Sequence, residues 1–258
     1  MQLSVITPTY NRGEAPFLRE VCESITQAKD YHHLTLEHLI VNDGSNDRTE
    51  QEIRALQRRF PHIRYLKNPA NRGITFSKNH ALAEAHGDLI IEIDDDDLVP
   101  YYALGLRVQL LLQSDHAWLC GNALTINETG QLQFRDNLLG RYIPDQWECF
   151  RAFYEGRHFA FSGTRIYYKE ALERIHGWNE HIHSLCEDFD LWLRMTYACG
   201  APAFSEIPLI YWRQKESSLG IDAVRSGAYL SKLHEIKDWY KDWYGEALQR
   251  QEIVAVKV

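Results

Sequence analysis

The chain has 258 residues, 45% of them apolar, and a formal net charge of −8 at pH 7. This length fits one large domain, alone or with a small appendage, and the apolar content is ample for a core. The negative charge argues against nucleic acid as the main partner, because a phosphate backbone selects clustered cations.

The sequence shows no membrane span and no export signal. Its apolar runs are far shorter than a bilayer span, and the first of them begins at Leu3 without a basic segment or cleavage site before it. We therefore expect no transmembrane segment and a cytoplasmic location. The cysteines are five in number, scattered and without a Cys-x-x-Cys pair, which indicates free buried thiols rather than disulfides or a zinc cluster.

The first 115 residues alternate strand-like and helix-like segments. Strands are expected at 3–7, 38–41, 63–66 and 89–93, and helices at 17–28, 47–60, 75–85 and 100–113. This alternation predicts an α/β fold with a Rossmann-like, mostly parallel sheet flanked by helices. In such sheets ligands bind beyond the carboxyl ends of the strands.

The pattern changes after residue 117 to irregular strands and longer loops. A helix at 187–197 and a strand at 204–212 follow, and residues 223–249 predict one long amphipathic helix. That helix could fold back on the domain, pair in a dimer or touch a membrane surface. We expect a nucleotide-binding half at 1–115, a mixed acceptor half at 116–220 and a helical extension at 221–258.

Four consecutive carboxylates, Asp94 to Asp97, follow the apolar strand at 89–93. Carboxylates at such close range repel one another unless a cation lies among them. Mg²⁺ or Mn²⁺ supplies that charge and prefers oxygen ligands together with substrate phosphates. The alternative is a solvated loop in which Asp97 caps the following helix.

A second acidic pair, Glu187 and Asp188, begins the helix at 187–197, beside apolar residues. Partial desolvation there would raise the proton affinity of a carboxylate, so that it could act as a general base on a hydroxyl group. Cations expected at the same end of the sheet, Arg12, Arg72 and Lys78, suit a diphosphate. The aromatic stretch 150–168 could either stack on sugars or belong to the core.

Several nucleotide and hydrolase motifs are missing from the sequence. It has no phosphate loop of the Walker type, no Gly-x-Gly-x-x-Gly, no His-Glu-x-x-His and no Gly-x-Ser-x-Gly. Their absence argues against the commonest nucleotide hydrolases, dehydrogenases, zinc proteases and serine esterases.

In combination these motifs resemble the family 2 inverting glycosyltransferases of the GT-A fold. The resemblance extends over residues 3 to about 213. The matching stretches, in family order, are Ser4–Arg12, Val41–Thr49, Asn71–Ala81, Asp94–Asp97 and Glu187–Arg194.

The resemblance implies a role for each matching residue. The donor nucleotide and sugar would contact the residues placed at the strand ends, namely Pro8, Thr9, Tyr10, Arg12, Asp43, Arg72, Lys78, Asp94 and Asp95. Asp96, with Asp94, would bind Mn²⁺ or Mg²⁺. Asp188 would be the general base and Glu187 would position the acceptor or the sugar.

The chain departs from the family pattern at two places. Asn42 stands where many members have aspartate, and Lys215 stands where a histidine able to reach the metal or the phosphates often lies. A lysine repels a cation but attracts a diphosphate, so we expect Lys215 to contact the leaving group.

The resemblance implies an inverting hexosyltransferase that moves a sugar from a nucleotide-diphosphate donor, with UDP as the expected nucleotide, to an acceptor hydroxyl. Carbohydrate or lipid-linked acceptors of polysaccharide or glycoconjugate biosynthesis are expected, with peripheral membrane contact as an option. The alternatives are a non-catalytic nucleotide- or carbohydrate-binding homologue and a sugar-nucleotide pyrophosphorylase. The latter usually has a glycine-rich basic signature, which residues 7–13 lack.

Overall fold

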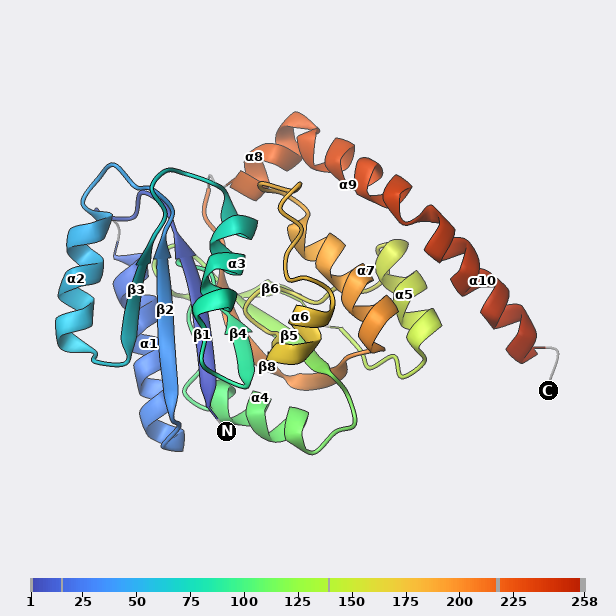
Figure 1. Ribbon diagram of the computed structural model, residues 1–258, viewed down its shortest axis with the longest axis horizontal. Helices are drawn as coiled ribbons and strands as arrows, with labels where there is room; N and C mark the ends of the chain where they lie inside the picture. The colour runs from blue at the N-terminus through green and yellow to red at the C-terminus, as the bar shows by residue number, and fades with distance from the viewer. Residues whose placement is uncertain (1, 15, 139, 217–218, 256–258) are drawn as a thin grey trace.

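Strand β1 (Leu3–Thr9) lies between two parallel neighbours, β2 (Leu36–Asn42) and β4 (Leu89–Glu92), and β3 (Ile63–Lys67) pairs with β2 on the far side. The computed structural model describes residues 2–14, 16–138, 140–216 and 219–255. These four strands were all predicted from their short apolar runs. They form the parallel half of the sheet (Figure 1).

The second half of the chain extends this sheet with antiparallel pairing. Strand β7 (Ile166–Tyr168) pairs antiparallel with β4 and with β5 (Trp118–Ile126). Strand β6 (Leu132–Leu138) continues the order, and β8 (Ala203–Arg213) pairs parallel with β5. Within the described ranges this is one eight-stranded mixed sheet. The predicted α/β class with a mixed second half is confirmed.

Helices cover both faces of the sheet, and successive residues of β1 point into apolar clusters on opposite faces. Val5 packs with side chains of α1 and α4, whereas the next residue, Ile6, packs with side chains of α3, α5 and α7. The helices concerned are α1 (Phe17–His32), α2 (Thr49–Arg59), α3 (Ile74–Glu84), α4 (Ala103–Leu112), α5 (Gln146–Tyr154), α6 (Lys169–Arg174) and α7 (Glu187–Cys199).

Helix α5 lies in a stretch for which the sequence predicted only irregular strands and loops. Its buried residues include Phe150 and Phe153, so this part of the aromatic stretch belongs to the core. Phe159 is 45% exposed and stays available at the surface. Four of the cysteines are buried and Cys199 is half-buried, all as free thiols, as expected.

The predicted long C-terminal helix is wrong, because the structure has three helices there. They are α8 (Leu219–Ser226), α9 (Ala228–Trp239) and α10 (Lys241–Ala255). Gly227, with φ of 78°, ends α8 in the left-handed conformation that favours glycine, although the apolar periodicity continues across it.

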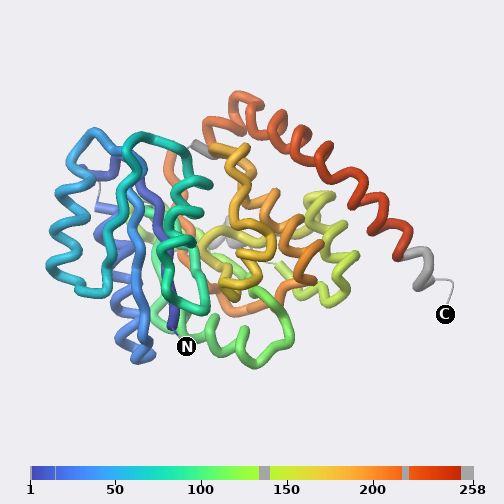
Figure 2. Tube along the Cα trace, viewed as in Figure 1, coloured from blue at the N-terminus to red at the C-terminus, as the bar shows by residue number. Residues whose placement is uncertain are grey.

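The C-terminal arm, α9 and α10, folds back on the domain. It runs beside α7 and α5 (Figure 2). Two aromatic stacks fasten α10, Tyr154 on Tyr244 with ring centroids 4.3 Å apart and Tyr197 on Trp243 at 3.9 Å. In the described part of the chain, no helix is both long and apolar enough to cross a membrane.

Candidate functional site

The carboxyl ends of β1, β2 and β4 meet at one edge of the sheet, as the parallel arrangement predicts. The Thr9 hydroxyl, at the end of β1, donates a 2.7 Å hydrogen bond to Asp95 Oδ2 beyond β4. The Thr9 carbonyl accepts a 2.9 Å hydrogen bond from the backbone N–H of Asp43 beyond β2. Tyr10 follows with a 43% exposed side chain. The sheet therefore brings three of the sequence motifs together.

Protein cations neutralise part of the acidic run. Arg12 Nε lies 3.0 Å from Asp95 Oδ1, and Arg12 Nη2 lies 3.4 Å from Asp96 Oδ2. The ammonium of Lys215, which follows β8, forms an ion pair with the same Asp96 oxygen. We call Arg12, Asp95, Asp96 and Lys215 the donor-end cluster. It places Lys215 beside the acidic run, and its expected contact with a leaving diphosphate stays a prediction.

Asp97 does not cap the next helix. Helix α4 begins at Ala103, and Tyr102 is its N-terminal flanking residue. The fully buried Asp97 instead accepts a 2.8 Å hydrogen bond from the Arg213 backbone N–H through Oδ1, and burial raises its pKa well above the ordinary value. Arg213 Nε also donates to the Asp96 carbonyl, at 2.6 Å. The last aspartate therefore anchors the acidic loop to β8.

Asp94 differs from its three successors because its carboxylate has no hydrogen-bond partner among the described residues. Burial raises its pKa to about 6, Lys78 opposes this rise, and nearby carboxylates including Asp188 reinforce it. A half-buried carboxylate in that state is stabilised by any cation that approaches it.

The carboxylates of the acidic run determine whether a divalent ion can bind at this edge of the sheet. No group of three or more His, Cys, Asp or Glu side chains in the described ranges is placed to hold a metal. A protein-only cage is therefore not formed. Asp94 and Asp96 still offer hard oxygen ligands, and Mg²⁺ commonly takes one or two carboxylates and completes its shell with substrate phosphates. The residues fit an ion that arrives with a diphosphate.

Asp43 is buried and organises the loop before α3. Its Oδ1 accepts from the Arg72 backbone N–H and its Oδ2 from that of Gly73, both at 2.9 Å. A side chain at Gly73, where φ is 90°, would lie 2.5 Å from the His183 carbonyl, so glycine is required there. The loop holds the exposed Arg72, whose guanidinium lies over the Phe76 ring at 3.8 Å.

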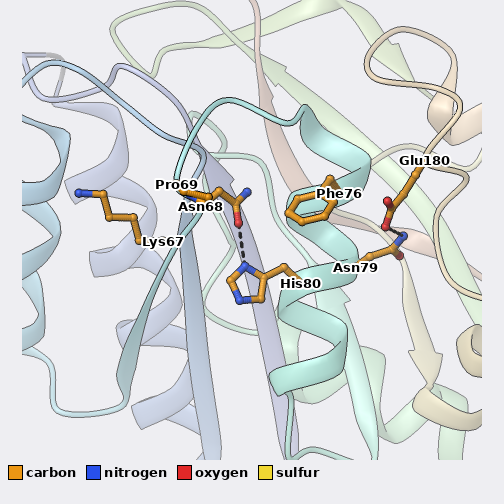
Figure 3. A pocket seen from close by; sticks show the side chains of 7 residues that line it. All are labelled: Lys67, Asn68, Pro69, Phe76, Asn79, His80 and Glu180. Carbon is orange, nitrogen blue, oxygen red and sulfur yellow. Dashed lines mark hydrogen bonds between the residues drawn. The ribbon is translucent and has the colours of Figure 1, made fainter.

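A pocket of about 330 Å³ opens beside this loop (Figure 3). It is lined by Lys67, Asn68, Pro69, Phe76, Asn79, His80 and Glu180. Asn68 links it to the site, because its Nδ2 donates to Asp43 Oδ1 at 2.7 Å, and Phe76 carries Arg72. None of the residues predicted to bind the donor lines the pocket, so we regard it as a neighbour of the site.

The second acidic pair lies at the start of α7 and contacts a network of buried charged side chains. Arg165 Nη2, just before β7, lies 2.6 Å from both Glu92 Oε1 and Asp188 Oδ1. Lys78 Nζ lies 2.8 Å from Glu92 Oε2, 3.8 Å from Glu187 Oε1 and 3.9 Å from Asp188 Oδ1. Sequence reasoning placed Lys78 with the donor phosphates. In the structure it is buried, and its ammonium faces these carboxylates instead.

The two acidic residues have opposite pKa shifts. Burial and repulsion from Asp188 raise the pKa of Glu187 to about 7, against the effect of Lys78. Burial would also raise the pKa of Asp188, but the charges of Arg165 and Lys78 outweigh it and the pKa is lowered. Desolvation of the pair, expected from the sequence, therefore raises the proton affinity of Glu187 only.

The backbone that leads into this pair is strained, and the C-terminal arm lies against it. Leu185 and Cys186 both have positive φ, 65° and 60°, a conformation that costs about 1–3 kcal/mol for a residue other than glycine. Cys186 Sγ contacts the Tyr229 carbonyl of α9 at 3.8 Å. The Tyr240 hydroxyl donates to buried Asp190 at 2.6 Å. The arm thus supports the turn that positions Glu187.

Three residues of the site had no role in the sequence interpretation, namely Glu92, Arg165 and Tyr167. Glu92 is fully buried, and the hydroxyl of Tyr167 donates to its Oε1 at 2.8 Å. A glutamate within an otherwise apolar strand is itself a signal, because a buried carboxylate needs a charged or hydrogen-bonding partner. No comparable signal marks Arg165 in the sequence.

The raised pKa of Glu187 predicts a pH-dependent cost in stability. Its folded-state pKa, about 7, lies above its ordinary value of 4.5, so the folded protein binds the extra proton between these values. Wild-type stability attributable to this group is present below pH 4.5 and is lost as pH rises towards 7. Glu187→Gln should therefore gain stability relative to wild type over this window, by on the order of 1–3 kcal/mol. Melting temperatures at pH 5 and pH 8 measure the effect.

The control for this prediction is Glu235→Gln, at an exposed position on α9. Its stability difference from wild type should change little with pH. A melting difference for Glu187→Gln that is equal at pH 5 and pH 8 would contradict the assigned shift.

The fold and the site together define an α/β protein with one acidic centre at the carboxyl ends of its parallel strands and a second at the start of α7. Comparison with known proteins gives the family. The model for "Glycosyl transferase family 2" matches residues 4–176, and the chain belongs to that family.

Among the proteins that resemble it is the GalNAc(5)-diNAcBac-PP-undecaprenol beta-1,3-glucosyltransferase of Campylobacter jejuni. The two are 33% identical over 132 residues, 51% of this chain and 40% of that protein. The UDP-Glc:alpha-D-GlcNAc-diphosphoundecaprenol beta-1,3-glucosyltransferase WfgD of Escherichia coli is 24% identical over 144 residues, 56% and 51% of the two chains. The matches thus cover about half or less of these relatives.

The solved structures that are similar include S. aureus TarS 1–349 in complex with UDP-GlcNAc. The TM-score is 0.65 at 21% sequence identity, and the match covers 84% of this chain and 60% of that one. At this identity the likeness concerns the fold. The GT-A fold predicted from the motifs is confirmed.

Proposed function

We propose that this chain transfers a sugar from a UDP-sugar to a hydroxyl group, with inversion at the anomeric carbon. The observation that carries the proposal is that two charged centres lie near the carboxyl end of β4. One is the donor-end cluster. The other is Asp188 at the start of α7, a partly exposed carboxylate that forms an ion pair with the buried Arg165. The UDP-GlcNAc complex of TarS and the UDP-Glc donor in the name of WfgD support a UDP-sugar donor.

Asp188 is the proposed base. It accepts the proton of the acceptor hydroxyl while that oxygen forms a bond to the anomeric carbon on one face of the sugar. The bond from the anomeric carbon to the phosphate oxygen breaks on the opposite face, and its electron pair leaves with UDP. This single displacement inverts the anomeric configuration. Glu187 lies beside Asp188 and is proposed to position the acceptor or the sugar.

The donor-end cluster is proposed to hold the diphosphate. Arg12 and Lys215 carry the positive charge there, and planar guanidinium groups suit phosphate oxygens. Pro8, Thr9 and Tyr10 would contact the nucleoside together with Asp43 and Arg72. Mn²⁺ or Mg²⁺, held by Asp94 and Asp96, would supply further positive charge to the leaving diphosphate.

The acceptor class is proposed from the relatives. The names of the C. jejuni and E. coli proteins give diphosphoundecaprenol-linked sugars as their acceptors. We propose a lipid-linked or glycan acceptor for this chain, in polysaccharide or glycoconjugate biosynthesis. The exposed Phe159 is a candidate for stacking on an acceptor sugar. The cytoplasmic location stays a prediction.

Binding of nucleoside diphosphates tests the donor site directly. UDP, GDP, dTDP, CDP and ADP are compared by thermal shift with and without Mn²⁺, on wild type and Asp96→Ala. A ligand at 100 times its Kd stabilises the folded state by about 2.7 kcal/mol, which raises the melting temperature by several degrees. We expect the largest shift with UDP and Mn²⁺, and loss of the metal-dependent part in Asp96→Ala.

Turnover separates the proposal from its main alternative, a binding-only homologue. Release of UDP from UDP-glucose and UDP-GlcNAc is measured with and without added glycan acceptors. Stabilisation by UDP without release of UDP under any of these conditions would favour the binding-only homologue. No stabilisation by any of the five nucleotides would remove the support for the donor site.

A further inference from the structure

Arg165 is a fully buried cation whose contacts converge on one nitrogen atom. Its Nη2 lies 2.6 Å from Glu92 Oε1 and 2.6 Å from Asp188 Oδ1. Its Nε and Nη1 have no hydrogen-bond partner among the residues that the structure describes. The side chain is thus placed to bridge two carboxylates, with two of its three nitrogens left unpaired.

Stability does not account for an arginine in this position. Burying a charge is costly, and an ion pair in the interior often contributes less than well-packed apolar side chains would. The unpaired nitrogens add to the cost, because a buried donor without an acceptor loses its hydrogen bond to water. A buried arginine that costs stability in this way indicates a role in the neighbouring site that contains Asp188.

The network opens to solvent at the acidic pair, where the Glu187 side chain is 15% exposed. Lys78, Glu92 and Arg165 have side chains that are 0–1% exposed, whereas the Asp188 side chain is 26% exposed. The one hydrogen bond that a described side chain donates to the Asp188 carboxylate, from Arg165, falls on Oδ1, and the ionic contacts of Arg165 and Lys78 are made to the same oxygen. Oδ2 is left for a partner from outside.

Glu92 completes the arrangement because it fixes both cations. Its Oε1 accepts from Tyr167 and lies against Arg165, and its Oε2 lies 2.8 Å from Lys78 Nζ. Arg165 is therefore held by Glu92 at the position from which it contacts Asp188. The strand β4 carries Glu92, so the orientation of the carboxylate on α7 is set by the central sheet.

We propose that Arg165 is a positioning residue for the reaction, which locks Asp188 through Oδ1 so that Oδ2 alone faces the acceptor hydroxyl. Lys78 and Glu92 hold Arg165 in place. This inference rests on the proposed function, in which Asp188 is the base. On proton transfer the acceptor O–H bond breaks and the proton binds Oδ2, while Oδ1 keeps its hydrogen bond to Arg165.

The kinetic test is a double-mutant cycle of Arg165→Lys and Asp188→Asn, read as UDP release from UDP-glucose and UDP-GlcNAc. Arg165→Lys keeps the charge but loses the geometry of the guanidinium. We expect its kcat to fall about 10- to 100-fold with the KM for the donor unchanged, since small misplacements of a catalytic group have effects of this size. In the Asp188→Asn background the same change should have little further effect, because the residue acts through Asp188.

A matched control is Arg194→Lys on the same helix. Arg194 forms an ion pair with the buried Asp190 at 2.5 Å and does not contact Asp188. It should lower the melting temperature while leaving kcat near the wild-type value. The proposal is overturned if Arg165→Lys raises KM rather than lowering kcat, or if its effect multiplies in full with that of Asp188→Asn.

A structural test decides the proposal independently of turnover. In crystal structures, the Asp188 carboxylate of Arg165→Met should turn away from its wild-type orientation or adopt more than one rotamer. Should the methionine variant fail to fold, Arg165→Lys is used for the same comparison. An Asp188 with unchanged position and order would overturn the proposal. Absence of UDP release by wild type would instead contradict the proposed function, and the structural comparison would still decide the role of Arg165.

Discussion

Asp188→Asn should lower turnover by about 10²- to 10⁴-fold, the usual contribution of a positioned general base. Asparagine has nearly the same shape, and its carbonyl oxygen can accept the hydrogen bond from Arg165 that Oδ1 accepts at 2.6 Å in wild type. Its amide group would then occupy the place of Oδ2 and cannot take a proton from a hydroxyl. The fold and the donor-end cluster are left intact. UDP release from UDP-glucose and UDP-GlcNAc measures the loss.

Donor binding should survive this substitution. The shift in melting temperature produced by UDP and Mn²⁺ is expected to match that of wild type, because the residues of the donor-end cluster form ion pairs with one another and not with Asp188. Asp190→Asn is the matched control on the same helix. Asp190 is buried and accepts hydrogen bonds from Arg194 and Tyr240, so its replacement should lower the melting temperature while reducing turnover far less than Asp188→Asn does.

Glu187 offers the sharpest way to refute the assignment. Its pKa is raised to about 7, within the range useful to a general base near neutral pH. If Glu187→Gln abolished turnover and Asp188→Asn kept it, Glu187 would be the base and Asp188 a neighbouring charge. Near-normal turnover in both variants would remove the acidic pair from the mechanism.

Local sequence patterns predicted the parallel half of the fold, because each of its strands is a short apolar run that can be recognised without knowing its neighbours. Strands such as 89–93 are short apolar runs, and a sheet of parallel strands brings their polar ends to one edge. The placement of Asp43 and Asp94 at that edge follows from this geometry. The break between α8 and α9 was missed because apolar periodicity continues across Gly227, and only backbone conformation ends the helix there.

The partners of the acidic groups could not be predicted from local patterns. The repulsion within Asp94 to Asp97 was expected to require a metal ion, yet two protein cations reach Asp96, from 84 and 119 residues away in the chain. Arg165 similarly reaches Glu92 across the β4–β7 pairing, which no local pattern announces. Charge balance in a site is a property of the tertiary structure.

We expect Lys215 to determine how strongly donor binding depends on a divalent metal ion. Its ammonium now binds the Asp96 oxygen that is proposed to bind Mn²⁺, and Arg12 lies 3.4 Å from the same oxygen. A divalent ion must compete with both for that carboxylate. When a diphosphate is bound, the lysine can turn to the phosphate oxygens. We therefore expect Lys215 to provide positive charge for the nucleotide whether or not a metal is present.

Lys215→Met should therefore make UDP binding depend more steeply on Mn²⁺. Loss of a charge-assisted hydrogen bond weakens UDP binding in EDTA by about 10- to 100-fold. In Mn²⁺ the loss should be smaller, because Asp96 is freed for the ion, and Mn²⁺ alone should bind more tightly than to wild type. Calorimetric titration of UDP in EDTA and in Mn²⁺, and of Mn²⁺ alone, gives these affinities without reference to turnover.

Lys232→Met is the control for this change, because Lys232 is paired with the exposed Glu235 on α9, away from the donor-end cluster. It should bind UDP and Mn²⁺ as wild type does. An unchanged affinity of Lys215→Met for UDP in EDTA would show that the lysine only neutralises Asp96. A weaker affinity for Mn²⁺ alone would contradict the competition, since removal of a competing cation can only strengthen binding of the ion at a carboxylate that stays in place.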